Sequence, residues 1–154
     1  MKLFFLIFLT FYFILDECSA LDKKKFLSTK YNEVNLRKGP GLQHFITAKF
    51  LRKGIPLQVV GSFDNWRKVK FLNKKEGWVA KSQLSNIKYG IIINENVGLN
   101  YFPNKKSKKT AILQKNIIFK ILKCRSNWCK INFLDAQGWI LKSDFWGVDK
   151  SEIF

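Results

Sequence analysis

Residues 65–72 read NWRKVKFL and residues 127–134 read NWCKINFL, so the same pattern occurs twice in the chain at a spacing of 62 residues. At this spacing, seven of the 20 residues from 53 to 72 are identical to their counterparts. Nearby, residues 76–82 (EGWVAKS) match residues 137–143 (QGWILKS) at a spacing of 61. A period of this length indicates a tandem duplication of one small domain rather than a solenoid of short repeats.

Each copy of the repeat contains short segments rich in Val, Ile, Phe and Trp that are separated by turn residues, which is typical of an all-β barrel or sandwich. Asp64–Asn65 and Ser126–Asn127 indicate hairpin turns, and Pro40–Gly41 suits the centre of a type II turn, where glycine accepts a positive φ. We therefore predict an all-β fold of two tandem small domains, at residues 26–88 and 89–148, each a barrel or sandwich of five or six strands.

Strand alternation separates the predicted core from the predicted surface, because neighbouring side chains in a strand point to opposite faces. The set predicted for the interior comprises Val69, Phe71, Val79, Cys129, Ile131, Phe133 and Ile140. The opposite face then carries tryptophans beside lysines: Trp66, Lys68, Trp78, Trp128, Lys130 and Trp139. Each repeat is expected to present two tryptophans and at least one lysine on one outer face.

The N-terminal segment predicts export. Lys2 precedes the 13-residue apolar run Leu3–Leu15, and small residues lead up to Ala20, which together are typical of a signal peptide, residues 1–20, that is cleaved. A membrane-spanning helix needs about 20 apolar residues, so a permanent anchor is not expected. Cys18 would offer a site for lipid attachment, but acidic residues precede it where small residues are required. The chain that remains after cleavage is therefore expected to be exported.

The two remaining cysteines, Cys124 and Cys129, flank a predicted hairpin turn and would face each other across its strands. Since disulfides persist in an oxidising compartment, we predict a disulfide between them. It would contribute only about 2 kcal/mol, because the closed loop is short. The C-x4-C spacing differs from the C-x-x-C spacing of redox motifs.

Catalysis and metal binding are not expected. His44 is the only histidine in the chain, so a zinc site or a Cys-His dyad has few residues to build from. The nine acidic residues that remain after loss of residues 1–20 are scattered singly, which argues against paired catalytic carboxylates. We therefore expect no enzyme activity, no metal and no cofactor.

Three motifs in the first repeat resemble the bacterial Src-homology-3-like (SH3-like) domains of exported and cell-wall-associated proteins. Residues 35–41 (NLRKGPG) look like the family's opening N-[LV]-R-x-G-P signature, residues 64–69 (DNWRKV) like its W-x-[KR]-V strand, and residues 76–79 (EGWV) like its closing strand. With the second copy, the resemblance covers essentially the whole expected mature chain. The arrangement looks like that of tandem periplasmic proteins without a catalytic domain, which implies the periplasm or cell envelope as the location. The second copy lacks a counterpart of Arg37.

The resemblance implies barrels of five or six strands, each with an aromatic groove that contacts cell-wall peptides or partner proteins. Trp66 and Trp78 would line the first groove, and Trp128 and Trp139 the second. The other candidate ligand-binding residues are Arg37, Lys68 and Lys130. The alternative is a purely structural role, in which these tryptophans cover the small barrel and seal its loops. The aromatic and proline set that grips polyproline helices is missing, so such ligands are not expected.

The net charge of +17, or +18 after loss of residues 1–20, favours an acidic partner. Wall-peptide carboxylates and anionic lipid phosphates both fit, although 24 of the 28 basic residues are lysines, which compositional drift would also give. Nucleic acid fits the charge and the aromatics, but the export signal argues against it. The predicted function is a non-catalytic module that binds peptidoglycan or its stem peptides; the alternative is an envelope protein–protein adaptor.

The sequence also supports three predictions about segments outside the main motifs. Trp146 is expected to cover the end of the second barrel. The lysine run 105–109 is expected in a solvated loop, with contact to a polyanion as the alternative. The join at residues 86–91 has no Pro-rich or Ser-rich spacer, so the two barrels are expected to pack against each other.

Overall fold

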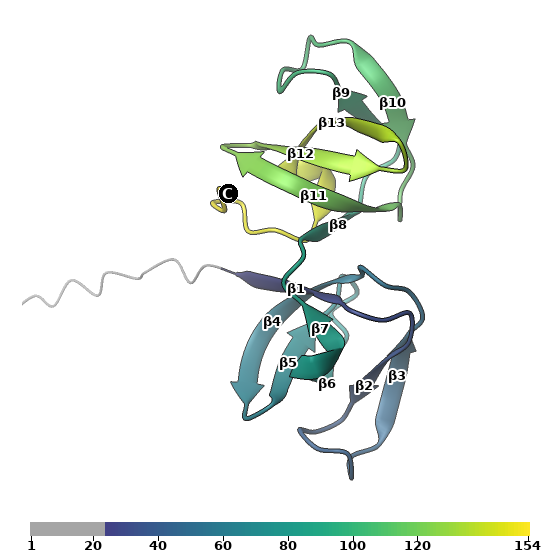
Figure 1. Cartoon of the computed structure of the whole chain (residues 1–154), viewed down its shortest axis with the longest axis vertical. Helices are drawn as coiled ribbons and strands as arrows, with labels where there is room; N and C mark the ends of the chain where they lie inside the picture. Colours follow the sequence, from purple (N-terminus) through teal and green to yellow (C-terminus); the bar gives the residue numbers. More distant parts are fainter. Residues whose placement is uncertain (1–23) are drawn as a thin grey trace, which may run out of the picture.

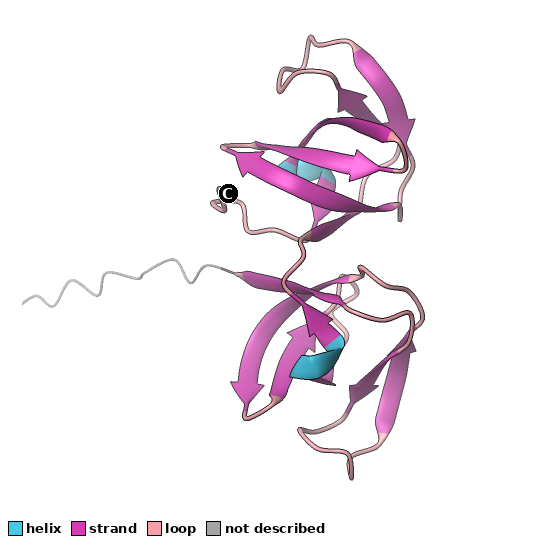
Figure 2. Cartoon of the chain, viewed as in Figure 1, coloured by secondary structure: helices cyan, strands magenta, loops and turns pink. Residues whose placement is uncertain are grey.

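The computed structural model describes residues 24–154, which form two antiparallel sheets of seven strands each (Figures 1 and 2). The predicted signal peptide, residues 1–20, lies outside the described residues. No helix within residues 24–154 is long and apolar enough to cross a membrane. The tandem all-β architecture predicted from the repeat is confirmed, whereas the boundaries 26–88 and 89–148 stay a prediction.

The first barrel is one sheet with the spatial order β3-β2-β6-β5-β4-β1-β7. Its strands are β1 (Lys25–Thr29), β2 (Val34–Arg37), β3 (Ile46–Phe50), β4 (Pro56–Phe63), β5 (Trp66–Lys70), β6 (Glu76–Ala80) and β7 (Leu84–Ser85). A single 3-10 turn, η1 (Lys81–Gln83), connects β6 to β7.

The second barrel has the equivalent order β10-β9-β13-β12-β11-β8-β14. Its strands are β8 (Tyr89–Ile92), β9 (Val97–Asn100), β10 (Lys109–Leu113), β11 (Ile118–Arg125), β12 (Trp128–Phe133), β13 (Ala136–Leu141) and β14 (Phe145–Trp146), with η2 (Lys142–Asp144) before the last. The prediction of five or six strands was too low, because β7 and β14 have two residues each and give no recognisable pattern.

The two predicted hairpin turns are confirmed. Phe63 pairs with Trp66, and Arg125 pairs with Trp128, so two residues connect the strands in each barrel. The first turn residues, Asp64 and Ser126, have φ of 44° and 39°.

The predicted type II turn was wrong. Gly41 does not have the positive φ that this turn requires at its second central residue. The reason lies in side-chain hydrogen bonds that hold the surrounding loop, described below.

The predicted interior residues pack into two cores. Val69, Val79, Cys129, Ile131 and Ile140 are at most 1% exposed. The first core comprises Val34, Leu36, Phe50, Leu57, Val69, Val79 and Leu84, with Phe71 packed against it. The second comprises Ile92, Val97, Leu99, Leu113, Phe119, Ile121, Cys124, Cys129, Ile131, Ile140 and Phe145, with Phe133 packed against it.

The predicted disulfide between Cys124 and Cys129 is present, and its two residues are paired across β11 and β12. Both cysteines are fully buried in the second core. The disulfide therefore joins the hairpin from inside the barrel, whereas the equivalent pair in the first barrel is Ser62 and Arg67.

In each barrel, a glycine of the G-W strand faces a core leucine of the neighbouring strand, with β2 beside β6 and β9 beside β13. A Cβ on Gly77 would lie 2.6 Å from Leu36 Cγ, and one on Gly138 would lie 2.6 Å from Leu99 Cγ. Both leucines are fully buried. The repeated glycine therefore makes room for a core leucine of the neighbouring strand.

Trp146 joins the two barrels rather than covering only the end of its own. Its ring packs edge-on against Phe26 at 5.0 Å and Phe71 at 5.9 Å between centroids, and both partners belong to the first barrel. The Nζ of Lys88, in the linker, lies 2.7 Å from the carboxylate of Glu152 in the C-terminal segment. These contacts agree with the expectation of packed barrels.

Replacing Gly77 with alanine should lower the free energy of unfolding by about 1–3 kcal/mol, because the new Cβ would overlap Leu36 and the carbonyl of Arg37. Urea unfolding measures this change. Gly61→Ala is the matched control, since its Cβ would meet Lys68 at an ordinary 3.4 Å. Equal effects of the two substitutions would contradict the proposed role of the close approach.

Replacing Trp146 with alanine should let the barrels reorient independently, because it removes both edge-on contacts with the first barrel. NMR relaxation of backbone amides measures the correlation time of each barrel, and the two times should separate in the variant. Phe45→Ala removes an aromatic ring that is 84% exposed and should leave one common correlation time. A common time in Trp146→Ala would show that other contacts fix the barrels.

Candidate functional site

The outer face of the first sheet carries most of the predicted site in adjacent rows. Arg37 on β2 pairs with Trp78 on β6, which in turn pairs with Lys68 on β5. One row away, Trp66 pairs with Ala80. Alternation therefore places Trp66 and Trp78 on one face, as the sequence predicted, and both are half-buried.

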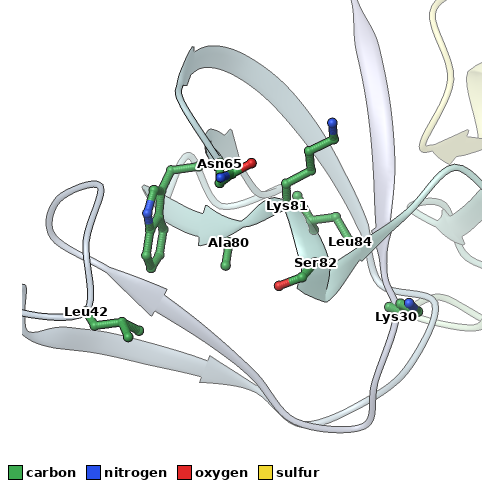
Figure 3. Close-up of a pocket in the computed structure, with 8 residues that line it drawn as sticks. Lys30, Leu42, Asn65, Ala80, Lys81, Ser82 and Leu84 are labelled. Carbon is green, nitrogen blue, oxygen red and sulfur yellow. The ribbon is translucent and has the colours of Figure 1, made fainter.

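A hollow of about 650 Å³ opens beside Trp66 (Figure 3). It lies between the β2–β3 loop and η1, with Leu42 at one end and Lys30 at the other. The lining residues are Lys30, Leu42, Asn65, Trp66, Ala80, Lys81, Ser82 and Leu84. An indole and aliphatic side chains thus form its wall, while two exposed lysines supply positive charge. We call this space the first hollow.

Arg37 shapes the loop that borders the first hollow. Its Nη1 donates hydrogen bonds to the carbonyls of Leu42, at 3.0 Å, and His44, at 2.8 Å. These two bonds draw the β2–β3 loop back over the sheet and hold Leu42 at the rim. The structure therefore gives Arg37 a loop-positioning role; direct contact of Arg37 with a ligand stays a prediction.

Lys68, one of the predicted ligand-binding residues, forms an ion pair within the first barrel. Its Nζ lies 3.3 Å from a carboxylate oxygen of Glu76, and both side chains are about 40% exposed. Such an exposed pair is worth at most about 1 kcal/mol, so a ligand carboxylate could replace Glu76 at little cost. The position equivalent to Glu76 is Gln137, and no ion pair to Lys130 occurs among residues 24–154.

The second barrel has an equivalent but smaller hollow, of about 330 Å³, which we call the second hollow. Its lining residues are Lys105, Asn127, Leu141, Lys142, Ser143 and Lys150. Trp128 lies beside it, paired with Leu141. The repeat thus places Asn, Lys and Ser at the same positions of both hollows.

The C-terminal segment covers part of the second hollow. Lys142, the counterpart of exposed Lys81, is only 8% exposed, and its Nζ donates to the carbonyls of Lys150, at 2.9 Å, and Glu152, at 2.6 Å. Further along, the amide of Cys124 donates to the carbonyl of Phe154 at 2.9 Å. The cation that the first hollow offers to solvent is therefore used internally in the second.

A local turn stabilises this segment. Asp149 Oδ1 accepts hydrogen bonds from the hydroxyl of Ser151, at 2.6 Å, and from its amide, at 2.9 Å. These two bonds hold the pKa of Asp149 below its usual value. The carboxylate therefore remains ionised at neutral pH and keeps the turn closed.

Trp139 is also less accessible than its counterpart. It is 8% exposed, and Lys123 Nζ and the Arg125 guanidinium lie 5.6 Å and 5.8 Å from the ring centroid. In the first barrel the equivalent positions are Gly61 and Phe63, and no cation–π contact to Trp78 occurs among residues 24–154. The predicted outer orientation of Trp139 holds, but basic side chains lie over its ring.

Sequence reasoning named only one of the eight residues that line the first hollow, Trp66, as a binding residue. The residues that it missed include Lys30, Leu42, Lys81 and Ser82. The signal for two of them was present, because Lys81–Ser82 recurs as Lys142–Ser143 directly after the G-W strand. Leu42 gave no signal, since its place at the rim depends on the hydrogen bonds of Arg37. No cluster of three or more potential metal ligands occurs within the described part of the chain.

Comparison with known proteins identifies one family in both halves of the chain. The family model described as "Bacterial SH3 domain" matches residues 30–86 and again residues 97–147. No curated protein sequence matches the chain significantly.

Two solved structures from Trichomonas vaginalis are similar. They are NlpC2 and NlpC1, each with 15% identity and a TM-score of 0.37. The matches cover 80% and 82% of this chain but only 48% and 47% of those chains. The chain thus spans about half their length, and at this identity and TM-score the likeness carries no argument about function.

Removing the guanidinium in Arg37→Ala should loosen the β2–β3 loop, because it deletes both hydrogen bonds to the carbonyls of Leu42 and His44. Hydrogen–deuterium exchange of the amides of residues 38–46 should become at least tenfold faster, as expected for the loss of a charged donor worth about 1.5–3 kcal/mol. Arg52→Ala removes the same charge from an exposed position and should leave this exchange unchanged. Unaltered exchange in Arg37→Ala would contradict the loop-positioning role.

Proposed function

Because the chain belongs to the bacterial SH3 domain family, with one domain in each half, we propose that it is an exported, non-catalytic module of the cell envelope. Its ligand is peptidoglycan or the stem peptides of peptidoglycan. The first hollow is the binding site, and Trp66 is its central contact.

The observation that carries this proposal is the composition of the first hollow. Trp66, Leu42 and Ala80 form an apolar wall, while Lys30 and Lys81 are exposed at its rim. Stem peptides combine small aliphatic side chains with free carboxylates. An indole packs well on the former, and ammonium groups pair with the latter.

The difference between the barrels supports one ligand site per chain. The second hollow has about half the volume of the first, and the Nζ of Lys142 donates to carbonyls of the C-terminal segment. Binding there would first require displacement of residues 150–152. The first hollow has no such segment across it in the described part of the chain, so we assign binding to the first barrel.

The alternative proposal is a protein–protein adaptor in the envelope. Leu42, Phe45 and Ile46 are 76%, 84% and 44% exposed, and they lie together on the β2–β3 loop and the start of β3. An exposed apolar strip beside a hollow suits a protein partner as well as a peptide.

Retention on purified sacculi tests the proposal. Trp66→Ala should reduce retention roughly tenfold or more, as expected for truncation of a central aromatic contact. Trp128→Ala, the equivalent residue of the second barrel, should change retention less than about twofold. In the wild type, muropeptides should alter tryptophan fluorescence and binding should persist at physiological salt.

Three outcomes would overturn the proposal in different ways. Retention that vanishes with salt, equally in both variants, would mean that the net charge alone acts. Cross-linking to one stoichiometric protein without sacculus retention would favour the adaptor. Hydrolysis of labelled sacculi by the pure protein would indicate an enzyme.

A further inference from the structure

The β9–β10 loop, residues 101–108, lies at the end of the molecule remote from the first barrel (Figure 1). It carries two exposed aromatic rings. Tyr101 and Phe102 are each 61% exposed, and their rings contact each other edge-on with centroids 4.7 Å apart. Neither ring belongs to the second core. Their exposure therefore cannot be explained by barrel stability.

Internal hydrogen bonds give this loop a fixed shape. The amide of Tyr101 donates to the carbonyl of Lys108 at 2.9 Å, and the amide of Phe102 donates to the hydroxyl of Ser107 at 2.9 Å. At the tip, the amide of Lys106 donates to Asn104 Oδ1 at 2.9 Å. The loop thus holds the rings in place before any partner binds, which limits the entropy lost on binding.

The charged residues of this loop and of β10 (Lys109–Leu113) are all lysines. The loop and the start of β10 contain Lys105, Lys106, Lys108 and Lys109, all exposed, and no acidic residue from Tyr101 to Leu113. No ion pair to any of these four lysines occurs among residues 24–154. A hollow of about 500 Å³ adjoins the rings and is lined by Tyr101, Phe102, Ser107, Lys108 and Thr110.

We propose that the β9–β10 loop docks the protein on an anionic lipid surface. Aromatic rings of this kind favour the level of the lipid headgroups, and neighbouring lysines are attracted to lipid phosphates. The hollow beside the rings offers room for one headgroup. Charge complementarity and the exposed rings together favour a membrane surface over a neutral partner.

The equivalent loop of the first barrel lacks this combination. Leu42 and Phe45 are exposed there, but Lys38 is the only lysine from Arg37 to Thr47. The lysine cluster is therefore a feature of the second repeat alone. Docking through it would leave the first hollow, on the other barrel, open to its own ligand.

Co-sedimentation with lipid vesicles tests this inference. The protein is the chain from Leu21 onward, which contains both complete cores, because every core residue lies between Phe26 and Val148. The vesicles are phosphatidylcholine alone or phosphatidylcholine with 30% phosphatidylglycerol, about the anionic content of a charged membrane surface. The wild type should bind the second kind and leave the first largely unbound.

Two double variants in the β9–β10 loop test the contributions of the lysines and of the aromatic rings separately. Lys106→Gln with Lys108→Gln should weaken binding at least tenfold, at about fivefold per lysine. Tyr101→Ala with Phe102→Ala should weaken it by about tenfold through loss of the rings. Neither variant touches Lys105, which lines the second hollow.

Matched controls come from the first barrel. Lys53→Gln with Lys75→Gln removes the same charge from exposed positions and should weaken vesicle binding by less than about threefold. Phe63→Ala removes a ring that is also 61% exposed and should have no effect on vesicle binding.

Equal losses in the loop and control lysine variants, with the aromatic variant unchanged, would overturn the proposal in favour of general charge attraction. Loop variants that lose binding to a single-stranded oligonucleotide but keep vesicle binding would assign the loop to nucleic acid. Sacculus retention should stay the same in all loop variants, so failure of this inference is distinguishable from failure of the proposed function.

Discussion

Packing of a core leucine over a glycine is the contact on which each barrel depends. Leu36 covers Gly77 and Leu99 covers Gly138, and beside them the opening and closing strands share one backbone pair, Arg37 with Trp78 or Asn100 with Trp139. Side-chain packing therefore makes up much of the contact between these strands. Because Trp78 and Trp139 directly follow the two glycines, the same contact fixes where their indoles lie on the outer face.

The two repeats share this leucine–glycine packing but differ in the side chains that cover the outer face. Where the first barrel has Gly61 and Phe63, the second has Lys123 and Arg125, and these cations lie over Trp139. Lys142 turns to the C-terminal carbonyls, whereas its counterpart in the first barrel is exposed. In the second barrel, cation–π contacts and internal hydrogen bonds occupy groups that the first barrel leaves available. The aromatic pattern alone is thus a poor guide to which face is open.

Much of the fold follows from the sequence because it depends on local periodicity. Strand alternation placed Val69 and Ile131 in the cores, and the turn residues placed the hairpins at Asp64 and Ser126. The predicted turn at Gly41 failed because the Arg37 side chain holds the loop through the carbonyls of Leu42 and His44. A side-chain contact of this kind leaves no periodic signal in the sequence.

The prediction that Trp146 covers the end of the second barrel failed for a related reason. A residue beyond the last motif can contact either barrel, and only the fold places it against Phe26 and Phe71, which are 120 and 75 residues earlier in the chain. Its position matters beyond stability. If the barrels are fixed to each other, the first hollow and the β9–β10 loop keep a constant separation. Two weak contacts at fixed geometry reinforce each other only when both targets can be reached together. In the proposed arrangement, the interface at Trp146 therefore determines whether the wall ligand and the lipid surface can be engaged by one molecule.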